Sequence, residues 1–573
     1  MKRRAFIIRT TQQSIGLAFI PSLLSLGFSE NSNSGLLSEM KEDNELPYMP
    51  DIIQTPEHPE EWVAFRNLLD SWRKDKTKEI GYDGSLYDHP EFKWVSSAFN
   101  CYFLMMYDQV FYNSKEGKYT VDHFLAESEN KFGRLDSIVL WHAYPRIGLD
   151  DRNQFDFYRE MPGGLSELRK ISAQFHQRGI KVFINYNPWD GGTRMENISD
   201  IEALTIIIQD IDADGIFLDT MAWGAAAFRE QLDQIKPGVV LESELALAVE
   251  NINDHHMSRA QWFGDSKAPG ILRNKWFERR HMQHGISRWE RDRTKELQTA
   301  WMNGSGIMIW ENVFGQWVGW NERDQSILRI MSPIQKRFAH LFSGEGWIPM
   351  ADETPVQNVY ANLWQDKGIR LWTLVNRSGN NIEGELLHIE AKEGDSYFDL
   401  IQGKEVFAQD QKKQKVLSGK ITPRGIACFL AGTPASLGDD FLTFLKGQSE
   451  IYKTLGISIH FPEIHAKLVP VVHTNQADQP LKGMVKIPSF KGTLDIVFRV
   501  REVGFYSSID LNVHRYNLKA DLTDHDNPQR PTYACGKEGG LLLCTWPKGG
   551  KLSFLLCIAM KCGQGLNTRL QVT

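Results

Sequence analysis

Short apolar runs that stop at polar residues recur along this chain from residue 98 onward, and helix-like segments separate most of them. The clearest run, at residues 216–218, reads Ile-Phe-Leu and stops at Asp219. Strands that alternate with helices predict βαβ units and a parallel sheet. The first five strands are expected at these positions: residues 98–106, 137–141, 181–186, 214–218 and 239–241.

Three further strands complete a set of eight, at residues 271–277, 306–310 and 347–350. The fold class predicted is α/β, with a closed (β/α)₈ TIM barrel over residues 92–352. A doubly wound open sheet is the alternative, but no glycine-rich phosphate loop follows the first strand.

The chain on either side of the barrel has different patterns. Residues 353–433 alternate apolar and polar positions between turn residues, which predicts an antiparallel β-sandwich. Residues 434–573 are expected to be a small β-rich C-terminal segment that is an incomplete domain, and residues 31–91 an N-terminal linker with a helical segment.

The N-terminus has the features of an export signal. Lys2, Arg3 and Arg4 precede an apolar stretch at residues 15–28. Pro21 interrupts this stretch, which is too short for a stable membrane span. The arginine pair is typical of twin-arginine signals, which predicts a periplasmic or extracellular protein. A cytosolic amphipathic helix is the alternative.

Composition narrows the possible partners. The formal net charge of -7 offers no basic field for a phosphate backbone, so nucleic acid is not an expected partner. The 17 tryptophans are many for a soluble chain and gather near the predicted strand ends, where they suit stacking against sugar rings. Filling a large core is the simpler interpretation of any one of them.

Acidic residues follow several predicted strands, and in a barrel all such positions meet at one mouth. Cleavage of a glycosidic bond needs two carboxyl groups, one to protonate the leaving oxygen and one to attack or to activate water. Asp219 is the strongest candidate, with a helix N-cap as its alternative role. Glu242 and Glu244 face the same way on a continuing strand, and Glu242 is nearer to its end. The four predicted catalytic residues are Asp219, Glu242, Glu244 and Glu311.

Glu311 is equally well explained as a buried structural carboxylate, and the turn that holds Asp190 and Arg194 either clamps a sugar hydroxyl or pairs internally. Side chains near the other predicted strand ends are expected to contact substrate. The predicted substrate-binding residues are Asp108, His142, Trp189, Asp190, Arg194, Trp223, Trp262, Arg279, His281 and Trp310. The histidine spacing matches no metal triad, so neither a metal nor another cofactor is predicted.

The segment Gly-Ile-Phe-Leu-Asp at residues 215–219 resembles the fourth-strand nucleophile segment of retaining (β/α)₈ glycoside hydrolases of the α-amylase and α-galactosidase clans. The resemblance implies that Asp219 is the nucleophile, that Glu242 or Glu244 is the acid/base, and that Glu311 is a third acid. Phe217 stands where α-amylases have an arginine, so an α-glucan substrate is not implied. Residues 496–530 weakly resemble the start of a formylglycine-generating, sulfatase-modifying domain.

The sequence therefore predicts an exported glycosidase that acts on an oligosaccharide or polysaccharide, with a two-carboxylate, retaining mechanism. A non-catalytic carbohydrate-binding protein on a hydrolase-like barrel is the alternative. The sugar, its linkage and the oligomeric state are left open.

Overall fold

The computed structural model describes residues 49–142, 152–188, 194–224, 226–260, 266–313, 316–352, 354–411, 414–463 and 479, and the backbone of residues 492–500 and 564–572. The predicted export signal and most of the segment that resembles a sulfatase-modifying domain lie outside these ranges. The chain divides into two compact units. Residues 1–142, 158–188 and 198–462 form the first, and residues 143–157, 189–197 and 463–573 form the second.

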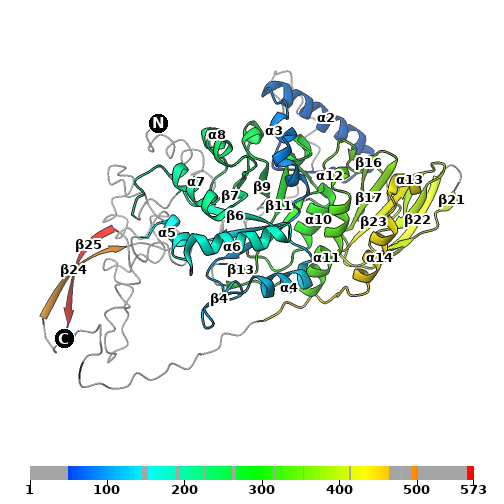
Figure 1. The fold of residues 1–573 in the computed structure, drawn as a ribbon. Coiled ribbons are helices and arrows are strands. Elements are labelled where there is room, and N and C mark those ends of the chain that lie inside the picture. The colour runs from blue at the N-terminus through cyan, green and yellow to red at the C-terminus, as the bar shows by residue number, and fades with distance from the viewer. Residues whose placement is uncertain are drawn as a thin grey trace. The chain divides into compact units, whose positions relative to one another are not determined.

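Eight parallel strands of the first unit close into a barrel, which confirms the predicted fold class (Figure 1). Around the barrel, neighbouring strands follow the order β11-β12-β2-β5-β6-β7-β8-β9. Their bounds are β2 (Asn100–Met105), β5 (Ser137–Trp141), β6 (Lys181–Tyr186), β7 (Gly215–Leu218), β8 (Val240–Ser243), β9 (Met257–Ala260), β11 (Met282–Gly285) and β12 (Gly306–Ile309).

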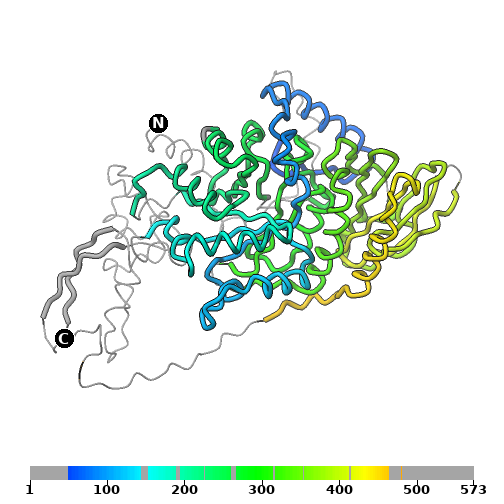
Figure 2. The backbone as a smooth tube through the Cα atoms, viewed as in Figure 1, coloured from blue at the N-terminus to red at the C-terminus, as the bar shows by residue number. Residues whose placement is uncertain are grey.

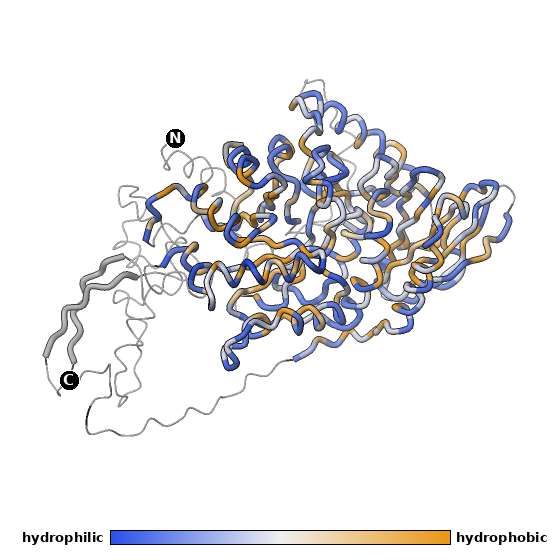
Figure 3. The backbone as a smooth tube through the Cα atoms, in the orientation of Figure 1, coloured by the Kyte–Doolittle hydropathy of each residue, from blue (hydrophilic) through white to orange (hydrophobic). Residues whose placement is uncertain are grey.

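Amphipathic helices connect most of these strands and surround the barrel (Figures 1 and 2). The longer ones are α4 (Val121–Phe132), α6 (Gly164–Gln177), α7 (Asp200–Ile211), α8 (Ala226–Ile235), α10 (Thr294–Asn303) and α11 (Glu322–Arg337). Their apolar sides pack on the strands, and Figure 3 shows hydrophobic residues gathered along the strands while hydrophilic ones cover the outer helices. Helix α7 begins at a capping box, in which Ser199 and Glu202 satisfy each other's backbone N–H groups.

Two of the predicted barrel strands are wrong. Residues 271–277 form the short strand β10 (Ile271–Leu272) and helix α9 (Arg273–Phe277), and the sixth strand is β9. Residues 347–350 contain β15 (Trp347–Ile348), which pairs with β16 outside the barrel. The strand at residues 306–309 is consequently the eighth of the barrel, and β11 is the seventh.

An antiparallel sandwich follows the barrel within the same unit. One sheet has the order β15-β16-β17-β23-β19-β20 and the other β18-β22-β21. Apolar side chains of both sheets meet in one buried cluster that includes Trp372, Leu387 and Phe429. The strand bounds are β16 (Val359–Asp366), β17 (Ile369–Asn376), β18 (Ile382–Glu390), β19 (Ser396–Asp399), β20 (Lys404–Glu405), β21 (Gln409–Gln411), β22 (Gln414–Ile421) and β23 (Ile426–Gly432).

Shorter elements complete the first unit. They are β1 (Ile52–Ile53), η1 (Pro59–Glu61), α2 (Trp62–Glu79), α3 (Ser85–Asp88), η2 (Pro90–Ser97), β3 (Tyr112–Asn113), β4 (Lys118–Tyr119), η3 (Val249–Asp254), β13 (Asn312–Val313), β14 (Gln316–Trp317), α12 (Ala339–Phe342), α13 (Pro434–Leu437) and α14 (Phe441–Tyr452). Helix α5 (Gln154–Arg159) contains residues of both units, since the division falls between residues 157 and 158. In the second unit, β24 (Gly492–Val500) pairs antiparallel with β25 (Gln564–Val572). No helix among the described residues is both long and apolar enough to cross a bilayer.

Candidate active site

Asp219 lies at the C-terminal end of β7, at the mouth of the barrel. Its backbone N–H donates to the carbonyl of Tyr186 on the neighbouring strand, 3.0 Å away, which extends the strand pairing to the carboxylate. The indole Nε1 of Trp141, at the end of β5, donates to Asp219 Oδ2 over 3.2 Å. The residue is 7% exposed. Its carboxyl group is thus held in place, and the residue is largely buried.

Glu244 lies beside Asp219, one residue beyond β8, and is clamped by positive charge. Its Oε1 forms an ion pair with Arg259 Nη2 at 2.6 Å and a second ion pair with Arg288. Its Oε2 accepts a hydrogen bond from the backbone N–H of Thr220 over 2.6 Å. Burial raises the pKa of Glu244, but the two arginines and these hydrogen bonds outweigh burial and lower that pKa to about 2.

The carboxyl groups of Asp219 and Glu244 are close enough for each to shift the pKa of the other. Burial raises the pKa of Asp219 well above its ordinary value, and the negative charge of Glu244 raises it further. The arginines therefore favour the ionised form of Glu244, whereas burial and the charge of Glu244 favour the protonated form of Asp219. Two adjacent carboxyl groups whose environments separate their pKa values are typical of acid–base catalytic sites.

The backbone between the two carboxyl groups is strained. Thr220 has a φ of 59°, in the left-handed region that a β-branched residue rarely adopts. This conformation costs about 1–2 kcal/mol. It occurs at the residue whose N–H binds Glu244. Backbone strain that surrounding contacts maintain is concentrated at functional sites in proteins.

Aromatic side chains form the layer beneath these groups. Phe103 stacks on Trp310 with ring centroids 4.1 Å apart and meets Phe217 edge-on. The guanidinium of Arg259 lies 4.4 Å from the centre of the Phe217 ring, and that of Arg288 lies 4.9 Å from Trp310. The arginines that hold Glu244 are therefore themselves oriented by stacking. Trp310 lies in this layer and is buried, and its predicted contact with substrate stays a prediction.

Glu242 does not lie at the mouth, which corrects its predicted acid/base role. The residue is 0% exposed and sits inside the barrel, where His284 Nδ1 lies 2.8 Å from its Oε1. The other ring nitrogen, Nε2, donates to the carbonyl of Ala98 over 2.9 Å, just before β2 begins. Burial lowers the pKa of His284, but Glu242 outweighs it and raises that pKa. The two side chains form a sealed ion pair that a substrate cannot reach.

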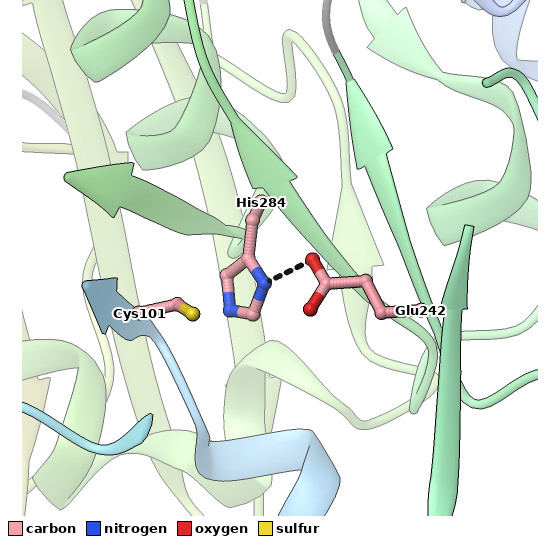
Figure 4. Close-up of side chains that lie close together, drawn as sticks. All are labelled: Cys101, Glu242 and His284. Atoms are coloured by element: carbon pink, nitrogen blue, oxygen red, sulfur yellow. Dashed lines mark hydrogen bonds and ion pairs between the residues drawn. The ribbon is translucent and has the colours of Figure 1, made fainter. Parts of the chain in front are cut away.

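Cys101 lies close to this pair, and its Sγ, a Glu242 oxygen and a His284 nitrogen are all within 4.8 Å of one another. Thiolate, imidazole and carboxylate are common zinc ligands. Figure 4 shows, however, that the His284 ring stands between the other two side chains, with Nδ1 turned to Glu242 and the opposite edge turned to Cys101. The hydrogen bond joins His284 to Glu242, and Cys101 lies on the other side of the ring.

Glu311 also faces away from the mouth. Its Oε2 accepts a hydrogen bond from Tyr102 over 3.3 Å and pairs with Lys131 of α4 at 3.5 Å. Trp310, one residue earlier, points into the barrel, so alternation along the strand turns Glu311 toward the surrounding helices. Burial raises the pKa of Glu311. The prediction that it is a third catalytic acid is therefore corrected, and the structural alternative describes it better.

Arg279 and His281 lie at the opposite end of the barrel from the mouth. Both precede β11, so they mark its N-terminal end. His281 Nε2 lies 2.8 Å from Ser258 Oγ, and the guanidinium of Arg279 stacks 3.6 Å from the centre of the Trp276 ring. Their predicted contact with substrate is wrong because residues 271–277 are not the preceding barrel strand.

The other predicted binding residues are scattered. Asp108, after β2, accepts from Asn312 Nδ2 over 2.5 Å. His142 is buried edge-on against Tyr158, and burial lowers its pKa to about 3, so the ring is neutral. Trp223 donates to Asp254 over 3.3 Å, in the segment that leads to β9.

The remaining predicted residues are Arg194, Trp189, Asp190 and Trp262. Arg194 pairs with Asp156 at 2.5 Å, within the second unit. Trp189, Asp190 and Trp262 lie outside the described residues.

Sequence reasoning missed Arg259, Arg288 and Trp141. Arg259 belongs to β9, whose residues Met-Ser-Arg-Ala have no apolar run, and Arg288 follows β11, which reads Met-Gln-His-Gly. Trp141 ends a recognised strand, and its position could have identified it.

No family model and no curated protein sequence matches the chain. Among solved structures, the α-amylase of Anoxybacillus is 11% identical with a TM-score of 0.41, over 60% of this chain and 99% of that one. The α-amylase of Geobacillus thermoleovorans is 13% identical with a TM-score of 0.41, over 59% and 98% of the two chains. A β-L-arabinopyranosidase from Geobacillus stearothermophilus is 12% identical with a TM-score of 0.40, over 60% and 99%. Similarity at this level identifies neither a substrate nor a reaction for this chain.

Proposed function

We propose that this protein is a glycoside hydrolase that acts on an oligosaccharide or polysaccharide, with Asp219 as its reacting carboxyl group. The observation that carries the proposal is the pair of carboxyl groups at the barrel mouth, in which Arg259 and Arg288 bind Glu244 while burial and the charge of Glu244 raise the pKa of Asp219. Hydrolysis of a glycosidic bond begins with a carboxylic acid that protonates the leaving oxygen.

In this proposal Asp219 is the general acid rather than the nucleophile expected from sequence. It gives its proton to the glycosidic oxygen as the bond to the anomeric carbon breaks. The resulting carboxylate is stabilised by Arg288 and Arg259, whose charges act to lower the pKa of Asp219. Glu244 is a positioning residue, because Thr220 and both arginines already occupy its oxygens.

A second carboxylate is needed on the opposite face of the sugar. Asp108 is our candidate for it. The strands before Asp108 and Asn312, β2 and β12, lie across the barrel from β7 and β8 in the strand order. The hydrogen bond from Asn312 and one from the backbone N–H of Val110, at 3.0 Å, hold Asp108 in place. The anomer released first, measured by proton NMR, distinguishes retention from inversion.

The first test is Asp219→Asn, assayed on a panel of aryl glycosides. Removal of a general acid lowers the rate by about 10²–10⁴-fold. We expect kcat/KM to fall within that range while oligosaccharide binding, measured by calorimetry, persists. Full activity of Asp219→Asn would overturn the proposal. Binding of sugars by the wild-type protein without turnover of any of them would instead favour the alternative, a carbohydrate-binding protein.

A second test separates the two possible roles of Asp219. Glu244→Gln removes the negative charge that raises the pKa of Asp219, so that pKa falls. If Asp219 acts in its protonated form, the alkaline limb of the kcat/KM profile moves to lower pH. If Asp219 acts as an ionised nucleophile, the acidic limb moves to lower pH instead. Glu311→Gln is the matched control, and its pH profile should equal that of the wild type.

We also propose that the protein is exported, on the basis of the arginine pair and apolar stretch of residues 1–30. Fractionation of cells that express the full chain tests this, with Arg3→Lys/Arg4→Lys as the variant. Retention of that variant in the cytoplasm is the expected result.

A further inference from the structure

Positively charged side chains line a cavity in the first unit. Its volume is about 300 Å³, at the lower end of the roughly 300–1,000 Å³ that small-molecule sites occupy. The described residues that line it are Ser266, Lys267, Thr294, Lys295, Gln298, Asn358, Arg377 and Arg424. Four of these eight are lysine or arginine, and none is a carboxylate. The remaining lining residues carry hydroxyl or amide groups, which hydrogen-bond to oxygen-rich ligands.

The four cations come from four separate segments. Lys267 precedes β10, Lys295 lies in the first turn of α10, Arg377 follows β17, and Arg424 is in the turn between β22 and β23. The cavity is therefore formed only where the barrel meets the sandwich. Lys267 is paired with Glu57 at 2.8 Å. Asp292 lies near Arg424 and is engaged by Thr294, so two carboxylates offset part of this charge from outside the lining.

Its position relates the cavity to the barrel mouth. Helix α10 follows β11, so it starts on the side of the barrel where the strands end. The same β11–α10 connection carries Arg288, the partner of Glu244. Residues 286–293 thus connect the segment that carries Arg288 to the first turn of α10, which lines the cavity.

The frame of the cavity is rigid. Gln298 Nε2 donates to the carbonyls of Asn376, Arg424 and Gly425 at 3.0, 2.9 and 3.2 Å, which joins α10 to two turns of the sandwich. The N–H of Arg377 donates to the carbonyl of Asn358 over 2.8 Å. Arg424 has a φ of 52°, a left-handed conformation that costs an arginine energy. These contacts hold the charged side chains on a fixed scaffold.

We propose that this cavity binds an acidic substituent of the glycan, a sulfate or a carboxylate, while neutral sugar units occupy the barrel mouth. Several cations around an oxygen-rich anion give charge-assisted hydrogen bonds, which are about twice as strong as neutral ones. This assignment rests on the proposed glycosidase function for the glycan, but the anion site itself is tested by binding alone. It predicts an acidic polysaccharide as the substrate class.

The test compares Lys295→Ala/Arg424→Ala with the control Lys446→Ala/Lys404→Ala, which removes two exposed lysines from α14 and β20. Calorimetry measures binding of a sulfated tetrasaccharide, a uronate-containing tetrasaccharide, their neutral counterpart and inorganic sulfate. We expect the cavity variant to bind at least one acidic tetrasaccharide about tenfold more weakly than the control does, and the neutral one equally well. Hydrolysis of small neutral aryl glycosides should stay unchanged, so failure here is distinguishable from failure of the catalytic assignment.

Three outcomes would overturn this inference. Equal affinity of the cavity variant and the control for the acidic tetrasaccharides would show that the cavity binds neither of them. Equal affinity of the wild type for acidic and neutral tetrasaccharides would show that charge is not recognised. Binding of inorganic sulfate as tight as that of the sulfated tetrasaccharide would show an ion site without a glycan.

Discussion

Two glutamates only two positions apart on one strand have different environments in this protein. Glu244 stands at the end of β8 among guanidinium groups, and its charge raises the pKa of Asp219. Glu242 points into the barrel and pairs with His284. Their side chains leave the strand on the same side, as period-two alternation requires, but one step along the axis separates the mouth from the sealed interior. The depth of each glutamate in the barrel therefore decides its chemical role.

This difference leads to a prediction for Glu242→Ala. Removal of one partner from a buried ion pair leaves the other without compensation and costs about 3–5 kcal/mol. We expect the free energy of unfolding, from urea titration, to fall by that amount. The pH profile of the remaining activity should match that of the wild type, because Glu242 does not touch the site.

A double-mutant cycle checks the cause. Glu242→Ala/His284→Ala should be much less destabilised than the sum of the two single variants, since each removes the same interaction. Additive losses would contradict the ion pair as the source of the effect.

At the scale of elements, strands were recognised where the sequence is apolar and missed where it is polar. Strands β5 and β6 have the bounds that their apolar runs predict. Strands β9 and β11 escaped recognition because their inward residues, Arg259 and His284, are polar. Because these two strands place charged or polar side chains inside the barrel, their sequences do not read as hydrophobic segments. The same mistake moved Arg279 and His281 to the wrong end of the molecule.

The free energy of unfolding at acid pH tests how β6 and β7 are joined. Asp214, just before β7, accepts hydrogen bonds from His176 Nε2 at 2.7 Å and from the backbone N–H of Val182 at 2.9 Å, and pairs with Lys181. Burial raises the pKa of Asp214, but these partners outweigh it and lower that pKa to about 2 from 3.8. A pKa lowered on folding stabilises the protein above the unfolded value, and this contribution disappears as pH falls toward 2.

We therefore expect Asp214→Asn to lose about 2 kcal/mol of unfolding free energy at pH 7, from a shift of nearly two pH units. Urea titrations at pH 7 and pH 3 measure the difference from wild type, which should be smaller at pH 3. Asp122→Asn, an exposed carboxylate of α4, is the control. An equal gap at both pH values would show that Asp214 acts through something other than its charge.

At the scale of the first unit, the barrel and the sandwich form one body. Helix α10 of the barrel lies against β17, and the side chains of Gln298 and Trp301 donate to sandwich carbonyls. Gln298 is buried, so its three hydrogen bonds are shielded from water. The sandwich thus holds the helix that follows Arg288, which connects its packing to the geometry of the mouth.

Gln298→Leu is expected to weaken this junction. The substitution removes the side-chain donor to three carbonyls, of which that of Gly425 still accepts from the N–H of Asn376. An unsatisfied buried polar group costs about 1–3 kcal/mol. Limited proteolysis should cleave the turns at residues 376–382 and 421–426 faster than in the wild type. The control variant Gln209→Ala, on the exposed side of α7, should be cleaved at the same rate as the wild type. Unchanged proteolysis of Gln298→Leu would show that other contacts carry the junction.

The sequence by itself determined the fold class and the position of Asp219. Alternating strands and helices imply a parallel sheet, and a carboxylate directly after an apolar strand must lie at the end of that sheet. Local pattern is sufficient for both conclusions because each depends on period and chain order alone.

Only the tertiary structure decided which charges meet. The four charged residues of the site come from different strands: Asp219 follows β7, Glu244 follows β8, Arg259 is in β9, and Arg288 follows β11. The pKa values of the two carboxyl groups depend on distances that the closure of the barrel sets. Coulomb energies change with every ångström and with burial, neither of which a linear pattern encodes. For the same reason, sequence placed Glu242 and Glu311 in the site, whereas the folded chain turns one inward and the other outward.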